Sequence, residues 1–360
     1  MKKINQISPY LGNEEKEQLL EVIDSKWLSE GPKTNQLKED FSNLLGRKHV
    51  TFAPNGTLAL FLALKSLGIK EGDEVIVPSF TFYASASSVV LAGANPIFAD
   101  VNLDDYQIDF DSASKLISKK TKAIMPVCIY GNTVCPCDVE RFARQFNLKV
   151  IQDAAQSVGV MTPRGHAGIT SDISTFSLFI DKTITTGEGG VIAYDDDEIH
   201  ENLIYMRNQG RIDRGSFIHP MMGWNFRISE LNSALGVAQI KKLPIIIQRK
   251  RENHSKYLEN LEGVGDIRPL LQNNCSKMVP FRFAFLSKFK DKIMKALGDS
   301  NIETRTFFYP MHMQPYFKTN KHASLKNSET LYDEGVALPI HLDLTEEDII
   351  SICSVIKSVF

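Results

Sequence analysis

One lysine stands in a segment rich in serine, threonine and glycine, SLFIDKTITTGEGG (residues 177–190), which we predict to join two strands. A lysine amine held near a phosphate in a partly apolar cleft can lose its proton near neutral pH and attack an aldehyde. The ordinary alternative for Lys182 is a solvated loop lysine. The glycines form neither a Walker nor a Rossmann loop, because the lysine precedes them and a strand follows them.

An aspartate ends an apolar run in the segment KVIQDAAQ (residues 149–156). A carboxylate at this position can keep a pyridine nitrogen protonated, and the protonated ring then accepts electrons from a carbanion on the substrate. The alternative for Asp153 is a cap on a following helix, which is the commoner role of an aspartate at such a junction.

The tripeptide Asn55-Gly56-Thr57 joins a predicted strand to a predicted helix. Glycine lets the backbone approach a ligand closely, and a helix N-terminus offers free amide groups to a phosphate. The alternative is a plain turn followed by a helix cap. We consider the three segments together because each of them falls at the end of a predicted strand.

Short apolar or β-branched runs alternate with amphipathic stretches between residues 50 and 195. This alternation is typical of βα units around a largely parallel sheet, and such domains bind ligands beyond the carboxyl ends of their strands. Apolar residues at spacings of three and four predict helices over 57–68 and 138–146. The predicted strands are 50–54, 74–79, 95–101, 123–130, 149–154, 173–179 and 189–194.

The C-terminal third of the chain has a different pattern. Residues 228–261 predict a long helix with a kink or boundary at Pro244, and the chain ends in a helix capped by Thr345. A chain of 360 residues is long enough for two packed domains. We expect a large domain with an N-terminal arm over residues 1–240 and a smaller one over 241–360.

The charge balance excludes some classes of partner. The chain has 41 basic and 43 acidic residues, and it shows no block of either sign. We therefore expect neither a general nucleic-acid-binding surface nor a polybasic membrane patch. The N-terminus has no apolar run behind its two lysines, so we expect a cytoplasmic protein.

The cysteines suggest no disulfide framework. There are five of them, their spacings match no disulfide pattern, and this fits a reducing compartment. Cys135 and Cys137 form a C-P-C in a predicted loop, but no second ligand pair lies at a useful spacing. We therefore expect ordinary loop cysteines and no metal site.

Six motifs occur in order along the chain: NGTLAL, PSFTFYAS, DAAQSVG, FSLFIDKTITTGEGG, GWNFRISELNSALG and FYPMHMQPYF. This set resembles the DegT/DnrJ/EryC1/StrS family of sugar aminotransferases over nearly the whole chain, from residue 25 to residue 349. The resemblance implies an α/β protein with the fold type I (aspartate aminotransferase-like) architecture. That architecture has a large, mostly parallel-sheet domain and a smaller C-terminal α+β domain, and its cofactor is pyridoxal 5'-phosphate.

The resemblance also implies a role for each matching residue. Lys182 would hold the cofactor as a Schiff base and, once released by substrate, would act as general acid and base. Asn225 matches an asparagine that reaches the phosphate from the neighbouring subunit, so the resemblance implies a homodimer with shared active sites. The other cofactor-binding residues implied are Asp153 at the pyridinium nitrogen, Phe82 on the ring face, Gln156 near the phenolic oxygen, and Gly56, Thr57 and Ser177 at the phosphate.

Tyr309 and His312 lie in the segment that resembles the family's substrate-side loop, where sugar contact and loop packing are both open. Arg305 could bind a carboxylate of the amino donor, a nucleotide phosphate or a neighbouring acid. The chain departs from the family at Cys128, where histidine is common, and at Thr306, where relatives often have proline. Residues 179–181 are also less typical, since small polar residues often precede the lysine. These departures bear on the choice of sugar.

Among relatives, the motifs look most like those of the perosamine synthases, which aminate C4 of GDP-4-keto-6-deoxymannose with glutamate for surface polysaccharide. Enzymes for dTDP- or UDP-linked 3- or 4-keto sugars share most of these motifs and remain an alternative. A pyridoxal-phosphate-dependent sugar dehydratase would carry histidine in place of Lys182. A DNA-binding regulator would need an added domain, and an amino-acid aminotransferase would exchange two amino acids without a sugar.

Overall fold

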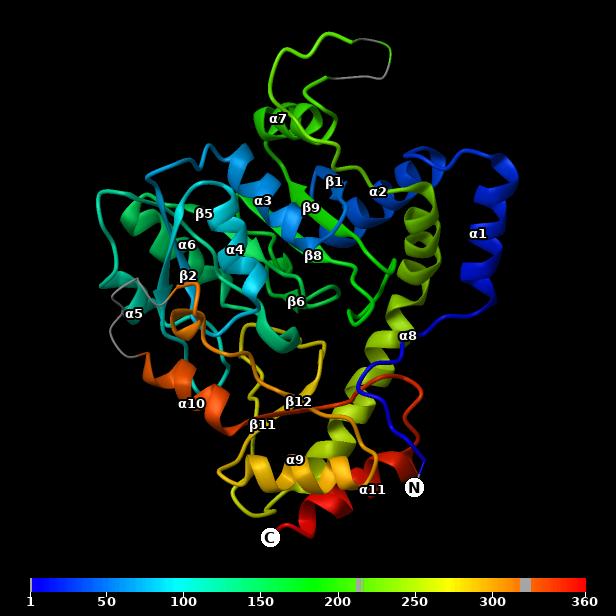
Figure 1. The fold of residues 1–360 in the computed structure, drawn as a ribbon, viewed down its shortest axis with the longest axis vertical. Coiled ribbons are helices and arrows are strands. Elements are labelled where there is room, and N and C mark those ends of the chain that lie inside the picture. The colour runs from blue at the N-terminus through cyan, green and yellow to red at the C-terminus, as the bar shows by residue number, and fades with distance from the viewer. Residues whose placement is uncertain (1, 212–214, 216, 318–324) are drawn as a thin grey trace.

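The computed structural model describes residues 2–211, 215, 217–317 and 325–360. Its centre is a seven-stranded sheet in the order β1-β9-β8-β5-β4-β2-β3 (Figure 1). β9 is antiparallel to both of its neighbours, and the strands from β8 to β3 are parallel. All seven predicted strands are confirmed: β1 (His49–Ala53), β2 (Glu74–Pro78), β3 (Asn95–Ala99), β4 (Thr121–Ile124), β5 (Lys149–Asp153), β8 (Ile173–Ser177) and β9 (Gly190–Tyr194).

Helices cover both faces of this sheet, which explains why its strands are apolar on both sides. α3 (Gly56–Ser66), α4 (Tyr83–Leu91) and α7 (Asp197–Arg207) share one core with the strand residues of one face. α2 (Pro32–Leu45), α5 (Phe110–Ser114) and α6 (Pro136–Phe146) pack on the other face. α3 is buried on nearly every side, as its almost continuous apolar sequence requires.

A second sheet, in the order β10-β11-β13-β12, forms the lower part of the molecule in Figure 1. Its core also includes Ile4, so both ends of the chain pack in this part. Its elements are β10 (Arg268–Pro269), β11 (Phe283–Leu286), α9 (Lys290–Asp299), β12 (Arg305–Thr306), α10 (Lys326–Glu334), β13 (Gly335–Leu338) and α11 (Glu346–Lys357). The remaining short elements are β6 (Met161–Thr162), β7 (Gly165–His166), η1 (Ile129–Gly131) and η2 (Met311–Met313).

One long helix, α8 (Glu230–Leu261), connects the two parts and packs against α1 (Asn13–Ser25), α2 and α11. It continues through Pro244, so of the two alternatives for that residue the boundary is wrong, and the kink stays a prediction. The predicted domain boundary after residue 240 falls within α8 and stays a prediction. The expected cap of the last helix is confirmed, since the Thr345 hydroxyl accepts a hydrogen bond from the Asp348 amide.

Cys135 and Cys275 form a disulfide across 140 residues of sequence. The expectation of no disulfide is therefore wrong, and the argument for a reducing compartment from cysteine spacing falls with it. Sequence spacing could not reveal this pair because the tertiary fold alone brings the two segments together. The bond joins the segment before β11 to the start of α6. The same two segments are also joined by a hydrogen bond from the Val279 amide to the Gly131 carbonyl.

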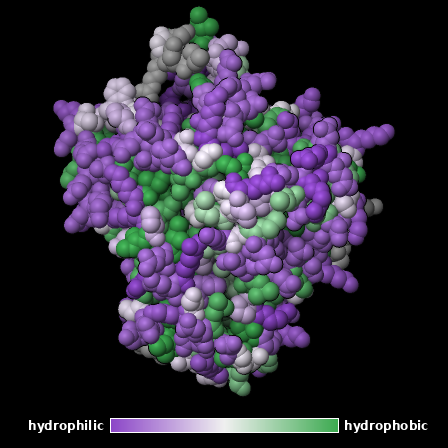
Figure 2. Space-filling view, turned by 180° about the vertical axis from the view of Figure 1, so that it is seen from behind, coloured by the Kyte–Doolittle hydropathy of each residue, from purple (hydrophilic) through white to green (hydrophobic). Residues whose placement is uncertain are grey.

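Figure 2 shows the face opposite to that of Figure 1, where hydrophilic side chains predominate and hydrophobic ones gather in a band across the middle. Within the residues that the structure describes, none of the helices combines the length and the apolar character needed to cross a membrane.

Candidate active site

A cavity of about 370 Å³ opens at the carboxyl ends of the central strands. It lies where strand ends meet helix starts, as expected for an α/β sheet. Lys182 lines it on the turn after β8, and Asp153 lines it at the end of β5. The other predicted residues that line it are Gly56, Thr57, Phe82, Gln156 and Ser177.

Asp153 is buried and held by two donors. Its Oδ2 accepts a hydrogen bond from Ser85 Oγ at 2.7 Å, and its Oδ1 accepts one from the Ala155 amide at 3.1 Å. Burial raises the pKa of the Asp153 carboxyl, while Ser85, Ala155 and Lys182 act against that rise. A buried carboxylate stabilises a cation placed beside it. Residues 154–160 form turns, so Asp153 caps no helix there.

The α3 N-terminus forms another corner of the cavity. Asn55 caps the helix, since its Oδ1 accepts from the Leu58 amide at 3.0 Å, and the chain then enters the helix through Gly56 and Thr57. A Cβ on Gly56 would lie 3.2 Å from Ser177 Cβ, so glycine allows the helix to approach the end of β8. Backbone amides and the hydroxyls of Thr57 and Ser177 at a helix N-terminus suit a phosphate.

Lys182 lies in the wall of the cavity with its side chain 14% exposed. Its Nζ is 3.3 Å from Asp181 Oδ1 and 4.7 Å from the centre of the Phe281 ring. Burial lowers the pKa of the Lys182 amine, and Arg282 lowers it further, while Asp181 and Asp153 raise it. A lysine with a lowered pKa is more often neutral, and the neutral amine is the nucleophile.

Phe82 and Gln156 complete the set of predicted residues in the cavity. Phe82 is 57% exposed and lies edge-on to Phe308 at 5.9 Å, so it is not a core residue. Gln156 is buried, and its Oε1 accepts a hydrogen bond from the Tyr130 amide at 2.6 Å. The cavity thus offers an amine, a carboxylate, an anion-binding corner and an exposed ring, which together fit pyridoxal phosphate.

Four predicted residues do not line this cavity. Asn225 forms a β-bridge with Asn208, and Tyr309 packs edge-on against Tyr332 at 4.9 Å. His312 is held by Ser79 Oγ at 2.7 Å and Glu329 Oε1 at 3.2 Å, as in the loop-packing alternative. Arg305 is exposed on β12. The partners predicted for these four residues are the neighbouring subunit's phosphate, the sugar and the amino donor. None of these groups belongs to the cavity of a single chain.

Sequence reasoning missed several side chains that line the cavity. Asp181 and Glu188 lie in the loop of Lys182, so their position was a usable signal. Phe281 and Phe308 come from distant segments with no local pattern to mark them. The departure at Cys128 also lines the cavity, where its thiol is buried beside Thr133 Oγ1 at 3.1 Å.

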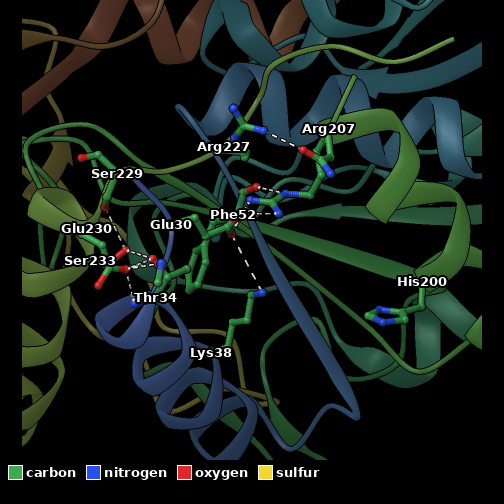
Figure 3. A network of polar contacts seen from close by, with 12 residues as sticks. Glu30, Thr34, Lys38, Phe52, His200, Arg207, Arg227, Ser229, Glu230 and Ser233 are labelled. Atoms are coloured by element: carbon green, nitrogen blue, oxygen red, sulfur yellow. Dashed lines mark hydrogen bonds and ion pairs between the residues drawn. The ribbon is translucent and has the colours of Figure 1, made fainter. Parts of the chain in front are cut away.

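A network of polar contacts, drawn in Figure 3, fixes the segment that carries Asn225. Arg207 donates to the Phe52 carbonyl at 2.9 Å and to both carboxylate oxygens of Glu30. Although burial opposes it, Arg207 holds the pKa of Glu30 below its ordinary value. Arg227 donates to Asn208 at 2.6 Å, and the Glu230 carboxylate accepts from the start of α2. The segment is therefore anchored on both sides.

Comparisons with known proteins agree with this geometry. The sequence model of the DegT/DnrJ/EryC1/StrS aminotransferase family matches residues 9–357. The chain is 35% identical to a GDP-perosamine synthase of Escherichia coli O157:H7, over 100% of this chain and 99% of that one. It is 36% identical to a GDP-perosamine synthase of Caulobacter vibrioides, over 96% and 95%.

A solved structure also resembles this one throughout. Helicobacter pylori PseC, an aminotransferase involved in the biosynthesis of pseudoaminic acid, superposes with a TM-score of 0.94 at 28% identity. The match covers 100% of this chain and 99% of that one.

Proposed function

We propose, on the premise that this chain belongs to the DegT/DnrJ/EryC1/StrS aminotransferase family, that it transfers an amino group from glutamate to C4 of a GDP-linked 4-keto-6-deoxy sugar. The chain is a pyridoxal-phosphate-dependent sugar aminotransferase. The nucleotide, the carbon and the donor are the proposed part. The observation that carries it is the similarity to GDP-perosamine synthases over nearly the full length of both chains.

The residues of the cavity have distinct proposed roles. When bound, pyridoxal phosphate supplies an electron sink for the carbon that gains or loses the amino group. Asp153 would hold a proton on the ring nitrogen, while Gly56, Thr57 and Ser177 would bind the phosphate. Lys182 Nζ would hold the cofactor covalently and, once displaced by the substrate's nitrogen, would carry a proton between the cofactor carbon and the sugar carbon that are joined through that nitrogen. Phe82 and Gln156 would orient the ring.

The acceptor can be identified by following one half-reaction. We would aminate the cofactor with glutamate, remove the donor, and add GDP-, dTDP- and UDP-linked 4-keto-6-deoxy sugars separately while recording the visible absorption spectrum. We expect only the GDP sugar to restore the original spectrum, since one pocket contact can separate close analogues. 2-Oxoglutarate serves as the positive control because it reverses the amination.

Each other outcome of this experiment has a definite meaning. Recovery with only a dTDP- or UDP-linked sugar would show that the proposed nucleotide is wrong. Recovery with 2-oxoglutarate and with no sugar would mean that the acceptor lies outside this panel, as a 3-keto sugar does, and would revive the amino-acid aminotransferase alternative. If one of the sugars reacts, Tyr309, His312 and Arg305 would be tested with it as sugar or donor contacts.

The active site is further proposed to be shared between two subunits, with Asn225 reaching the neighbour's phosphate. Large apolar side chains are exposed on the single chain near this segment, among them Phe217 at 86% and Met222 at 73%. Trp27 and Leu28, which precede α2, are each 51% exposed. Exposed apolar residues of this size are typical of protein interfaces. They support a homodimer in which this face is covered.

Replacing Asn225 with alanine is expected to weaken cofactor retention and activity, because the phosphate loses a contact. Cofactor retained after gel filtration measures the first effect, and Asn43→Ala, on the exposed side of α2, is the matched control. Mixing Lys182→Ala with Asn225→Ala subunits tests the sharing directly. Random exchange in a symmetric dimer leaves about one quarter of all sites intact, so activity should reappear.

This recovery requires that Lys182 and Asn225 of one site come from different chains. If both belonged to the same chain, no mixed dimer would contain an intact site, and the mixture would be no more active than the two variants assayed separately. Unchanged retention in Asn225→Ala would also contradict the shared site.

A further inference from the structure

A second, smaller cavity of about 30 Å³ shares Asp181 and Lys182 with the main one. It is lined by polar side chains from several separate elements. Lys250 comes from the middle of α8, Arg282 lies just before β11, and His341 follows β13. Lys182 therefore stands in the wall between two cavities, only one of which belongs to the proposed cofactor site.

In this cluster the Asp181 carboxylate contacts two cationic side chains. Asp181 Oδ2 accepts from Arg282 Nη2 at 3.0 Å, and Asp181 Oδ1 is 3.3 Å from Lys182 Nζ. The three side chains are 18%, 9% and 14% exposed, respectively, so water screens their charges weakly. The Asp181 carboxylate thus lies between the Lys182 amine and the Arg282 guanidinium.

Lys250 adds a third basic group. It is 5% exposed, and among the described residues its Nζ makes no hydrogen bond or ion pair, with the Phe281 ring centre 5.9 Å away. Burial, together with Arg282 and Lys182, lowers the pKa of Lys250 to about 7, although Asp181 acts against the shift. A protonated Lys250 would therefore add a positive charge near Lys182 that no carboxylate of the described residues pairs.

We propose that Asp181, held in place by Arg282, is a positioning residue that binds the free amine of Lys182 and governs how readily it loses its proton. The proposal rests on the proposed function, since it concerns the states in which Lys182 is not covalently attached. Asp181 favours the charged amine, and Arg282 and Lys250 disfavour it.

The remaining charged groups around Lys182 fit this balance. Asp153 at the end of β5 favours the charged amine from the side of the main cavity. His341, on the side of the small cavity, adds no full charge near neutral pH, because burial lowers its pKa. Asp181, whose Oδ1 is 3.3 Å from Lys182 Nζ, and Arg282, which donates to Asp181, act in opposite directions on that amine.

The test measures the amine of Lys182 without any substrate. The cofactor-free full chain would be treated with a trace of acetic anhydride at several pH values, and acetylation of Lys182 would be compared with that of exposed Lys16 by mass spectrometry. Only the neutral amine reacts. The variants are Asp181→Asn, Arg282→Met and Lys250→Met. Asp299→Asn, which removes a distant exposed carboxylate, is the charge control.

We expect Asp181→Asn to speed acetylation of Lys182 about tenfold below the pH where the amine titrates, since an opposite charge this close shifts a titration by one unit or more. Arg282→Met should slow it, and so should Lys250→Met at pH values where Lys250 is charged. A variant that merely loosened the structure would speed labelling whichever charge was removed. Opposite directions are therefore the signature of an electrostatic balance.

Equal rates in all variants, or a change in the same direction for Asp181→Asn and Arg282→Met, would overturn the proposal. If Arg282→Met fails to fold, Lys250→Met and the double variant Asp181→Asn with Arg282→Met provide the comparison. The double variant should fall between the two single ones. Failure of the proposed sugar transfer would leave these labelling rates unchanged, so the two ideas can fail separately.

Discussion

Replacing Lys182 with alanine is expected to abolish turnover, by at least about 10³-fold, while pyridoxal phosphate still binds. Among the described residues that line the cavity, Lys182 is the one that combines a nucleophilic nitrogen with a lowered pKa. The phosphate corner at Gly56 and the Asp153 carboxylate remain in the variant, so cofactor binding depends on groups that are unchanged. The measurements are turnover with the sugar from the acceptor experiment, and cofactor binding by equilibrium dialysis.

The matched control for this variant is Lys16→Ala on the exposed side of α1, which should leave turnover unchanged. Lys182→Arg keeps a positive charge but cannot form the covalent link, so it should be as inactive as the alanine variant. A Lys182→Ala enzyme with normal turnover would refute the assignment of this residue. Loss of cofactor binding together with turnover would instead mean that the lysine, and not the phosphate corner, holds the cofactor.

Asp153→Asn is expected to lower turnover about 10²-fold or more, because an amide cannot balance a positive charge on the ring nitrogen. Asparagine has nearly the same shape and can still accept a hydrogen bond from Ser85 or from the Ala155 amide, so the loss would report on charge. Ser85→Ala is the matched control. It removes one donor to Asp153 and leaves the carboxylate, so its effect should be smaller.

The same substitution should stabilise the cofactor-free protein. Burial raises the pKa of Asp153 in the folded state above its unfolded value. Above the unfolded value the unfolded chain releases this proton more readily, so the carboxyl destabilises the fold as pH rises. At pH 7 the cofactor-free Asp153→Asn variant should therefore have the higher Tm, and the difference should vanish toward pH 3. A lower Tm at pH 7 would contradict the assigned cost of burying this charge.

Much of the candidate site followed from local sequence. The seven strands could be predicted because each is a short apolar run bounded by turn residues, and the carboxyl ends of the strands that run in the same direction gather at one edge of the sheet. Lys182, Asp153 and Gly56 each end or follow such a run, which is why they share a cavity. One of the glycines after Lys182 has a tertiary reason instead. A Cβ on Gly190 would lie 2.3 Å from the Asn55 carbonyl oxygen, where β9 passes the start of α3.

Other features depend on residues that only the folded chain brings together. The disulfide joins Cys135 to Cys275, and no local pattern relates those two segments. Arg282 and Lys250 meet Asp181 behind Lys182 from elements far apart in the sequence. His312 has the composition of a ligand, yet Ser79 and Glu329 already hold both of its ring nitrogens.

The sequence by itself therefore determined the α/β class, the order of the strands along the chain and the lysine, carboxylate and helix start of the site. Periodicity and turn chemistry are local properties, and they report on the chain within a few residues of each position. The tertiary structure alone decided which distant groups surround Lys182, because burial and charge depend on everything packed around a side chain. The proton affinity of the reactive amine belongs to that second class, since Arg282 and Lys250 reach Asp181 and Lys182 from two distant segments.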